Sequence, residues 1–236
     1  MAAESGAAPS GKAGPARDGG PSGLADPARV QAFSDAVFAI IVTLLVLNLE
    51  APHTRPGGLL AALLRGWPAY LAFTISFIYL GVLWLNHHAL FRLVARVDAP
   101  LNWANLALLF SAVVIPFTTA TVAAAFAEGD RADERAAVAL YALATTPLSV
   151  PWLIIFWYLS RHPELRAPGI SEGYVRAQIP RPVTGIVLYG LSGVLGWFVD
   201  PVLGVAAFVV MIIFHAATSE RMPTWLLRWL PHRPQA

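Results

Sequence analysis

The chain has 236 residues, of which 57% are hydrophobic and 13% are charged, and its formal net charge is +2. A typical soluble domain is about 45–50% apolar and about 25% charged, so this composition excludes an ordinary soluble protein and indicates a membrane protein. The chain contains no cysteine, which excludes disulfides, thiolate catalysis and metal sites with cysteine ligands.

The first segment of the chain, residues 1–26, is rich in Ala, Gly, Pro and Ser and carries scattered charges. Such a segment cannot bury an apolar core, so we expect a disordered N-terminal tail. It also lacks the short apolar stretch and the cleavage site of a signal peptide. The first apolar run is therefore expected to stay in the protein as a helix.

Six apolar segments follow the tail. A helix needs ~20 residues to cross a bilayer, and each segment has a comparable or greater length. We expect them at 30–49, 60–90, 99–127, 134–160, 180–199 and 201–218. Together they predict an all-α membrane protein with one six-helix transmembrane domain over 27–219. Pro116, Pro147 and Pro151 are expected to kink the third and fourth segments. The aromatic and basic C-terminal tail, 220–236, is expected to lie at the membrane interface.

The distribution of Lys and Arg predicts how the chain is oriented. If the N-terminus lies in the cytoplasm, twelve of the 16 Lys and Arg residues fall on cytoplasmic segments. The four on the outer side are Arg55, Arg65, Arg131 and Arg135. Because cytoplasmic loops carry an excess of Lys and Arg, we predict a multi-pass protein of the cell membrane with both termini in the cytoplasm. This bias also accounts for the positive net charge, so we expect no nucleic-acid partner.

The first apolar segment carries polar residues on one side of its helix and an apolar stripe on another. On an ideal helix of about 100° per residue, Ile40, Leu44 and Leu47 lie within about 40° of one line. Ser34 and Asp35 point about 120–140° away from that line. We therefore expect the polar pair to face neighbouring helices of the same chain, and the stripe to face elsewhere.

Two interpretations of the apolar stripe remain open at this point. The stripe packs against lipid or another helix, or it lines a narrow apolar pore. Hydrophobic constrictions can gate a pore by dewetting. In that second case Thr43, about 60° from Ile40 around the helix, adds a hydroxyl group to the pore wall.

A carboxylate in a membrane segment requires hydrogen-bond donors or a cation, and the sequence offers candidates for Asp35 at the same membrane depth. The first segment begins, the second ends and the third begins on the cytoplasmic side. The candidate donors from the second and third segments are Trp84, Asn86, His87, His88, Asn102 and Asn105. Arg29 lies about 120° round the helix from Asp35, so we expect its partner on another helix or subunit.

The adjacent residues His87 and His88 raise the question of a metal site. Neighbouring residues differ by about 100° on a helix, so these two side chains cannot comfortably bind one ion. The sequence contains no HxxxH or HxxE pattern, and we predict neither a metal nor a cofactor. We expect one histidine to pair with Asp35 and the other to face the cytoplasmic interface.

A proton-coupled transporter is an alternative function, because Asp35 with His87 or His88 would suit a proton relay. Many such transporters have broken helices in two matching halves, and this sequence shows no internal repeat. An intramembrane enzyme is disfavoured, since GxSxG and HExxH patterns and paired catalytic carboxylates are absent. We therefore predict that the protein is not an enzyme.

The start of the first segment resembles a known signature. Arg29, Phe33, Ser34 and Asp35 form the pattern RxxxFSD, which is followed by AVFAIIVTLLVL. This arrangement resembles the transmembrane protein 175 family of potassium channels, and its bacterial branch in particular. The stretches WLNHHALF and LNWANLALLFSAVVIPF are also similar to the second and third spans of that family. The resemblance covers residues 28–120 well and the remainder only by length and hydropathy.

The resemblance implies a homotetramer of six-helix subunits, in which the first helix of each subunit lines a central pore without a re-entrant filter loop. It implies that the RxxxFSD residues hold helices together and that apolar rings form the constriction. The narrow ring would fall at Ile40 and continue at Leu44 and Leu47, with Thr43 as a hydroxyl layer. The expected function is a potassium-permeable cation channel with a hydrophobic gate. Its expected partners are the bilayer, potassium ions and further copies of the chain.

Overall fold

The structure is a computed structural model that describes residues 24–218. Within this range the chain consists of helices, their connecting loops and two isolated backbone bridges. The helices α1 to α10 span Pro27–Val46, Leu59–Arg65, Trp67–Phe91, Ala99–Val113, Ile115–Glu128, Arg131–Thr145, Ser149–Arg161, Glu172–Arg176, Pro180–Phe198 and Pro201–Ala217. Single 3₁₀ turns lie at Thr146–Leu148 (η1) and Pro163–Leu165 (η2). The predicted C-terminal tail, 220–236, and residues 1–23 of the predicted N-terminal tail lie outside the described residues.

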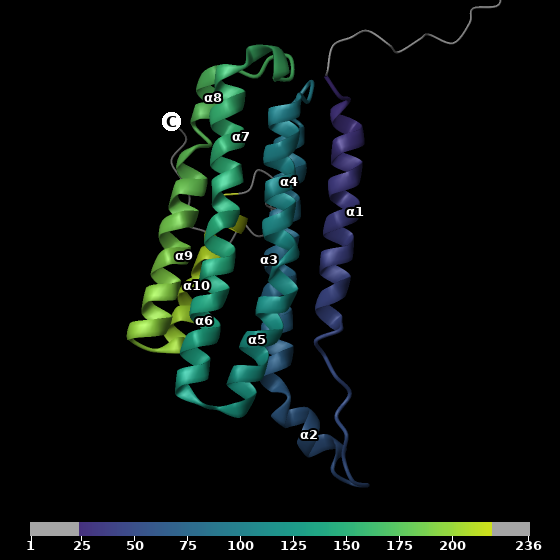
Figure 1. The fold of residues 1–236 in the computed structure, drawn as a ribbon, viewed down its shortest axis with the longest axis vertical. Helices are drawn as coiled ribbons and strands as arrows, with labels where there is room; N and C mark the ends of the chain where they lie inside the picture. Colours follow the sequence, from purple (N-terminus) through teal and green to yellow (C-terminus); the bar gives the residue numbers. More distant parts are fainter. Residues whose placement is uncertain (1–23, 219–236) are drawn as a thin grey trace, which may run out of the picture.

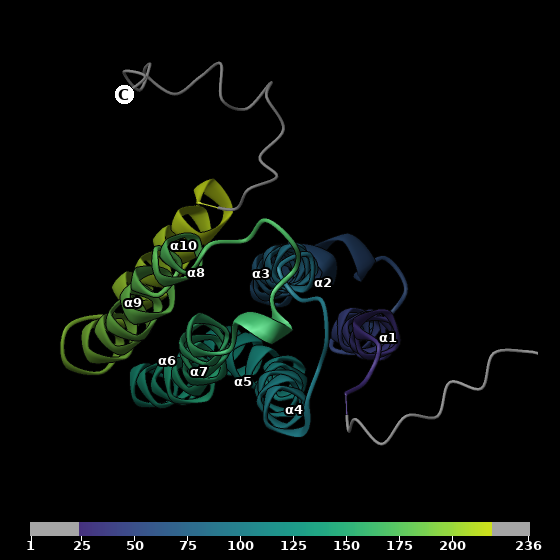
Figure 2. The same ribbon diagram turned by 90° about the horizontal axis from the view of Figure 1, so that it is seen from above.

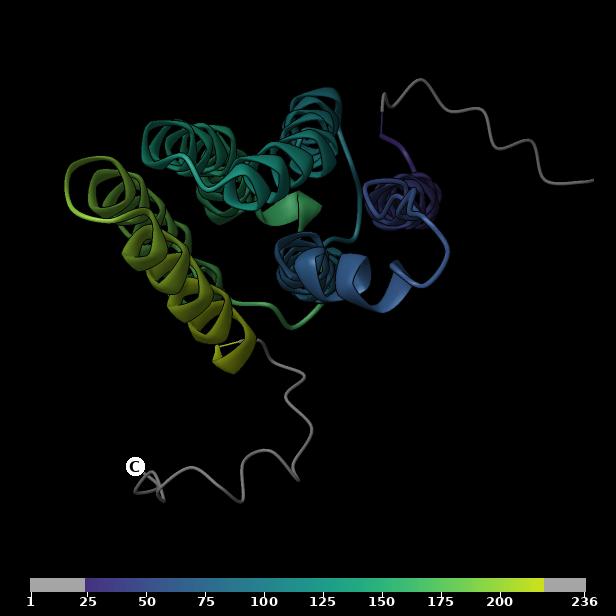
Figure 3. The same cartoon turned by 90° about the horizontal axis from the view of Figure 1, so that it is seen from below.

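The long helices run side by side along the longest axis of the molecule (Figure 1). α1 lies at one side of the bundle against α3 and α4, whereas α9 and α10 form a hairpin at the opposite side (Figure 2). We call the end that holds the start of α1 the proximal end, and the end with the α5–α6 and α9–α10 turns the distal end. At the distal end, the short α2 lies beside the start of α3 (Figure 3). Within one chain, α1 therefore has neighbours on one side only.

Four helical stretches are long and apolar enough to cross a bilayer: α1, α3, the α4–α5 pair over Ala99–Glu128, and the α6–α7 pair over Arg131–Arg161. α10 is an apolar helix of 17 residues, and α9 has 19 residues but does not belong to this group. All six predicted segments are thus largely helical. The membrane crossings of α9 and α10 stay a prediction.

Four of the helices begin at an aspartate cap. The side chains that accept hydrogen bonds from the first turns of α1, α4, α6 and α10 are those of Asp26, Asp98, Asp130 and Asp200. A carboxylate suits this position because it satisfies free N–H groups at the positive end of the helix dipole. At Asp200, the N–H of Val202 and the guanidinium of Arg131, 3.1 Å away, hold the pKa of the carboxyl below its ordinary value. That ion pair ties the start of α6 to the start of α10.

Glycine and proline decide where the helices are interrupted. The prediction of one helix over 60–90 was wrong, because Gly66 ends α2 and Pro68 lies in the first turn of α3. Pro116 lies in the first turn of α5 and Pro147 in η1, so both prolines interrupt their segments as predicted.

Small residues allow the α9–α10 hairpin to pack closely on α6. A Cβ atom added at Gly204 would lie 2.7 Å from the Cα of Gly196 and 2.7 Å from Cγ1 of Val138. Any larger side chain at Gly204 would therefore push α9 and α6 away from α10. This close approach is the kind of packing that holds membrane helices together.

At the proximal end, the loop between α3 and α4 pairs with two other segments. The N–H of Ala25 donates to the carbonyl of Val97 at 2.6 Å, and the N–H of Val97 donates back at 3.1 Å. On the other side of the loop, the N–H of Ala167 donates to the carbonyl of Leu93 at 2.8 Å. Ala25, two residues before α1, is thus fixed to the α3–α4 loop, and that loop is fixed to the segment after η2.

Candidate pore helix and its supports

α1 has one face packed against its own chain and one face that the described chain leaves uncovered. The buried residues are Ser34, Phe38, Ile41 and Leu45, each at most 1% exposed. The uncovered side includes Ile40 at 59% exposure, Leu44 at 39% and Leu47 at 70%. The buried positions recur at the spacing of a single helix face, so the two sets separate cleanly. Ile40 and Ile41, although adjacent in sequence, lie on different sides of α1.

The packed face contains a chain of buried hydrogen bonds that joins three helices. His87 Nε2 on α3 lies 2.9 Å from Asn105 Oδ1 on α4. Asn105 Nδ2 donates to Ser34 Oγ on α1 at 3.0 Å, and Ser34 Oγ donates to the Val30 carbonyl at 2.9 Å. The side chains of His87, Asn105 and Ser34 are all buried. This chain fixes the rotation of α1 relative to α3 and α4.

The direction of each of these hydrogen bonds follows from the bond between Ser34 and the Val30 carbonyl. The hydroxyl of Ser34 has a single proton, which it gives to the Val30 carbonyl, so it must accept from the amide of Asn105. The Asn105 Oδ1 then accepts, and His87 donates through Nε2–H. The other ring nitrogen, His87 Nδ1, is buried without a hydrogen-bond partner among the described residues. No described donor is therefore in place to deliver a proton to it.

Asp35 is half-buried and accepts a hydrogen bond from Trp84 Nε1 at 2.8 Å. His88 Nδ1 lies 2.7 Å from Gln31 Nε2, one helical turn before Asp35. The predicted pairing of Asp35 with a histidine was wrong: the rotation of α3 directs His87 towards α4 and His88 towards Gln31. Trp84 supplies the donor instead.

The remaining predicted donors do not reach Asp35. Asn86 accepts a hydrogen bond from Arg181 Nη2 on α9 at 3.0 Å, so its assignment to Asp35 was wrong. Asn102 is half-buried and makes no side-chain hydrogen bond within residues 24–218. The sequence analysis did not identify Gln31 as the partner of His88, although Gln31 lies four residues before Asp35 and hence on the same helix face.

The uncovered face also carries the other two residues of the RxxxFSD pattern. Phe33 is 54% exposed and Arg29 is exposed, and neither side chain makes a hydrogen bond, ion pair or ring contact with the described part of the chain. Thr43 Oγ1 donates to the Ile40 carbonyl at 2.8 Å, which leaves the lone pairs of its oxygen available as acceptors. Ser34 and Asp35 thus attach α1 to its own bundle, whereas Arg29 and Phe33 do not.

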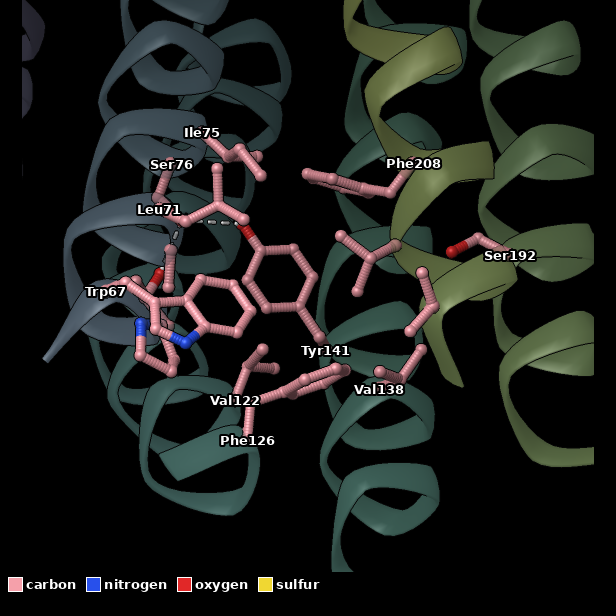
Figure 4. A pocket seen from close by; sticks show the side chains of 15 residues that line it. Trp67, Leu71, Ile75, Ser76, Val122, Phe126, Val138, Tyr141, Ser192 and Phe208 are labelled. Carbon is pink, nitrogen blue, oxygen red and sulfur yellow. Dashed lines mark hydrogen bonds between the residues drawn. The ribbon is translucent and has the colours of Figure 1, made fainter. Parts of the chain in front are cut away.

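A cavity of about 140 Å³ lies away from α1, in the distal half of the bundle (Figure 4). Its wall includes Trp67, Leu71, Val122, Phe126, Val138 and Phe208. Three hydroxyl groups in the wall bond to one another: Ser76 Oγ lies 3.1 Å from Tyr141 Oη and 2.7 Å from Thr119 Oγ1. These hydroxyls are satisfied within the wall, and no carboxylate or histidine lines the cavity.

Residues 24–218 contain no cluster of three His, Asp or Glu side chains suited to a metal ion.

Comparisons with known proteins bear on the helices that form this arrangement. Residues 29–116 match the family described as endosomal/lysosomal potassium channel TMEM175, so the match begins at Arg29. A potassium channel of Streptomyces collinus is 38% identical over 197 residues, which cover 83% of this chain and 94% of that protein. The endosomal/lysosomal proton channel TMEM175 of Bos taurus is 40% identical over 86 residues, 33% of this chain and 18% of that protein.

A solved structure is similar over most of the chain. The crystal structure of a lysosomal potassium-selective channel TMEM175 homolog from Chamaesiphon minutus superposes with a TM-score of 0.71 at 33% sequence identity. The superposition covers 83% of this chain and 98% of that one. The likeness therefore extends well beyond the residues that match the family in sequence.

Proposed function

Because the chain belongs to the TMEM175 family of potassium channels, we propose that four copies of it form a potassium-permeable pore to which each copy contributes α1. The observation that carries this proposal is the uncovered stripe of Ile40, Leu44 and Leu47 on a helix whose opposite face is fully packed. Four such stripes around a common axis enclose a narrow apolar path. Potassium is the permeant ion, and the channel needs no cofactor.

The constriction of this pore is formed by side chains rather than by backbone carbonyls. Rings of Ile40, Leu44 and Leu47 close the path by excluding water, and an ion crosses when the rings widen enough to admit part of its hydration shell. The oxygen of Thr43 offers an acceptor layer between two apolar rings. The sequence has no TVGYG-like segment, so we expect moderate rather than extreme preference for potassium over sodium.

The polar residues of α1 act as supports in this proposal. The bonds of Ser34 to Asn105 and of Asp35 to Trp84 set the rotation of α1, and with it the direction of the stripe. Arg29 and Phe33 lie exposed on the side that leads into the stripe, so we assign them contacts with a neighbouring subunit. The RxxxFSD pattern thereby serves both packing within a subunit and assembly between subunits.

We also propose that all six helical stretches over 27–219 cross the cell membrane, with both termini in the cytoplasm. The four long apolar stretches support this topology. α10 has 17 residues and a length of about 26 Å, close to the ~30 Å of a hydrocarbon core.

The hydrogen bonds around α1 favour the channel over the proton-coupled transporter. A relay through Asp35 and a histidine needs those groups to exchange a proton, and the described bonds lead them to other partners. The series of hydrogen bonds from His87 runs through the Asn105 amide and ends at the Val30 backbone carbonyl, and neither of these groups readily takes up or gives up a proton. This series of bonds therefore supports helix packing rather than proton movement.

Potassium flux through purified protein in liposomes tests the pore assignment. We expect Ile40→Asn and Leu47→Asn to raise potassium flux several-fold and to lower potassium selectivity over sodium, because a polar ring keeps the constriction hydrated. Ile213→Asn on α10 is the matched control, since Ile213 is 60% exposed and Ile40 is 59% exposed. The pore assignment is wrong if flux and selectivity of the α1 variants match those of wild type.

The oligomeric state tests assembly separately from conduction. Native mass spectrometry of the purified protein should give the mass of four chains of 25.3 kDa each. Phe33→Ala should shift the distribution towards smaller species, because it removes an exposed aromatic contact. Wild-type protein that gives only the mass of a monomer or a dimer would rule out the four-copy arrangement.

A further inference from the structure

The helices α9 and α10 lie on the side of α3 that faces away from α1 (Figure 2), and a second polar region lies between them and α3 near the proximal end. A cavity of about 50 Å³ lies there between α3, α7, α9 and α10. The polar part of its wall includes Asn86, Ser149, Gln178, Arg181 and His215. The apolar part includes Leu83, Leu90, Leu93, Trp152 and Phe156. The proposed pore uses none of these residues.

The guanidinium of Arg181 lies in this wall, and residues 24–218 supply no counter-charge to it. Its Nη1 donates to Gln178 Oε1 at 3.1 Å, and its Nη2 donates to Asn86 Oδ1 at 3.0 Å. Both acceptors are neutral amides. Its Nε is buried and has no acceptor within residues 24–218. No Asp or Glu side chain of the described chain forms an ion pair with Arg181.

A half-buried, unpaired guanidinium is unfavourable, and charged residues in membrane segments usually pair with an opposite charge. The surroundings of Arg181 increase the need for an anion. No carboxylate lines the cavity. Arg181 also lies in the first turn of α9, whose start has no side-chain cap and therefore keeps the positive end of the helix dipole open. The missing counter-charge must come from outside the described chain.

We propose that this cavity binds the phosphate group of an anionic membrane lipid. About 50 Å³ of space accommodates three to five water molecules at ~10–15 Å³ each, or one tetrahedral anion. Arginine suits phosphate because its N–H groups form charge-assisted hydrogen bonds to two oxygens. The cavity lies near the proximal ends of α3 and α10, where a helix that crosses the bilayer meets the headgroup region. Its apolar wall can contact the lipid tails.

The isosteric variant Gln178→Glu gives the sharpest test, because it places a carboxylate at the position that already contacts Arg181 at 3.1 Å. This internal counter-charge should replace the lipid phosphate without removing any side chain from the wall. Lipid binding is measured on the purified full-length protein by native mass spectrometry and by thermal unfolding, with phosphatidylglycerol or phosphatidylcholine as the added lipid. We expect phosphatidylglycerol to bind wild type more tightly than phosphatidylcholine and to raise its Tm.

Gln178→Glu and Arg181→Gln should each weaken phosphatidylglycerol binding by roughly tenfold or more, because each removes a charge-assisted contact. Without added lipid, Gln178→Glu should unfold at the same temperature as wild type or higher. If Arg181→Gln fails to fold, Gln178→Glu still decides the question. Arg176→Gln is the control, since Arg176 lies at the same end, is exposed and pairs with Glu172 at 2.7 Å. It should leave lipid binding within about twofold of wild type.

Inorganic phosphate distinguishes the two sources of the anion. Competition between millimolar phosphate and phosphatidylglycerol on wild type, but not on Gln178→Glu, would support a phosphate site at Arg181. A Tm shift with inorganic phosphate but none with phosphatidylglycerol would overturn the lipid assignment. Equal binding of phosphatidylglycerol to wild type and to Gln178→Glu would overturn the site altogether. These readouts do not depend on conduction, so they stand apart from the proposed pore.

Discussion

The two faces of α1 carry similar apolar side chains but have opposite relations to the rest of the chain. The packed face presents Phe38 and Ile41 at 1% exposure, and the uncovered face presents Phe33 at 54% and Ile40 at 59%. In a bilayer both faces favour apolar residues, because lipid tails are as apolar as a protein core. Polar anchors such as Ser34, rather than hydrophobicity, therefore decide which face turns inward. Equivalent substitutions on the two faces separate the folding of the subunit from conduction and assembly.

The largest difference is expected between Ile41→Asn and Ile40→Asn. An amide at residue 41 is buried without a partner and disrupts packing, which should cost about 3–5 kcal/mol of folding free energy. At residue 40 the same amide is exposed in the single subunit and should leave its fold intact. Unfolding in mixed micelles measures both variants. Equal destabilisation by the two changes would show that the faces are not distinct.

A smaller difference is expected between Phe38→Ala and Phe33→Ala. The ring of Phe38 lies 5.3 Å from the ring of His87, centroid to centroid, and its loss opens a void beside the buried hydrogen bonds. We expect Phe38→Ala to destabilise the subunit by about 3 kcal/mol, at the lower end for a buried phenylalanine because lipid lowers the transfer contribution. Phe33→Ala should change subunit stability by less than ~0.5 kcal/mol. Thermal unfolding of the dissociated subunit in detergent is the measurement.

The polar contacts of the packed face should contribute less than its large side chains. Asn105→Leu removes the amide between Ser34 and His87 and leaves both without their partner, at a cost of about 1–3 kcal/mol. Asn102→Leu on the same helix is the control, and we expect little change, since Asn102 makes no described side-chain hydrogen bond. Similar unfolding midpoints for the two leucine variants would contradict the role assigned to the buried chain.

The smallest effect is expected for the hydrogen bond between Trp84 and Asp35, towards the proximal end of α1. Trp84→Phe removes the N–H that bonds to Asp35 and should cost about 0.5–1.5 kcal/mol. A double-mutant cycle with Asp35→Asn isolates this bond, because the two changes should be less than additive. Trp103→Phe controls for the loss of an indole, since Trp103 is 72% exposed. Full additivity would show that the Trp84–Asp35 contact does not stabilise the subunit.

The order of these effects reflects which features the sequence could predict. Helix geometry alone places Ser34 and Ile40 on different sides of α1, because the residues of one helix keep fixed angles to one another. The partners of Asp35 were harder to predict, since they depend on how α3 is rotated between α1 and α9. That rotation directs Asn86 to Arg181 and leaves Trp84 to bond Asp35. Motif and depth narrow the candidates, but only the packing of the helices selects among them.

Local signals in the sequence set the helix boundaries where they were strong. Asp26 and Pro27 mark the start of α1, and Asp200 and Pro201 mark the start of α10. The break at Gly66 was missed although Arg65, Gly66 and Pro68 interrupt the sequence there, because the long apolar stretches on both sides were taken as one segment on hydropathy alone. The arrangement of several copies has no comparable local signal in one chain. It depends on surfaces such as the uncovered face of α1, whose partner lies outside that chain.

The paired backbone bonds between Ala25 and Val97 restrict how α1 can tilt. A swing of its proximal end away from the α3–α4 loop would have to break two hydrogen bonds of 2.6 and 3.1 Å, and near its distal end Asn48 Nδ2 donates to the carbonyl of Pro116 at 3.0 Å. The helix is thus tied to its own subunit at both ends, so tilting it alone would break hydrogen bonds at one end or the other. In the four-copy pore proposed above, a change of pore width therefore requires each α1 to move together with the helices to which it is bonded.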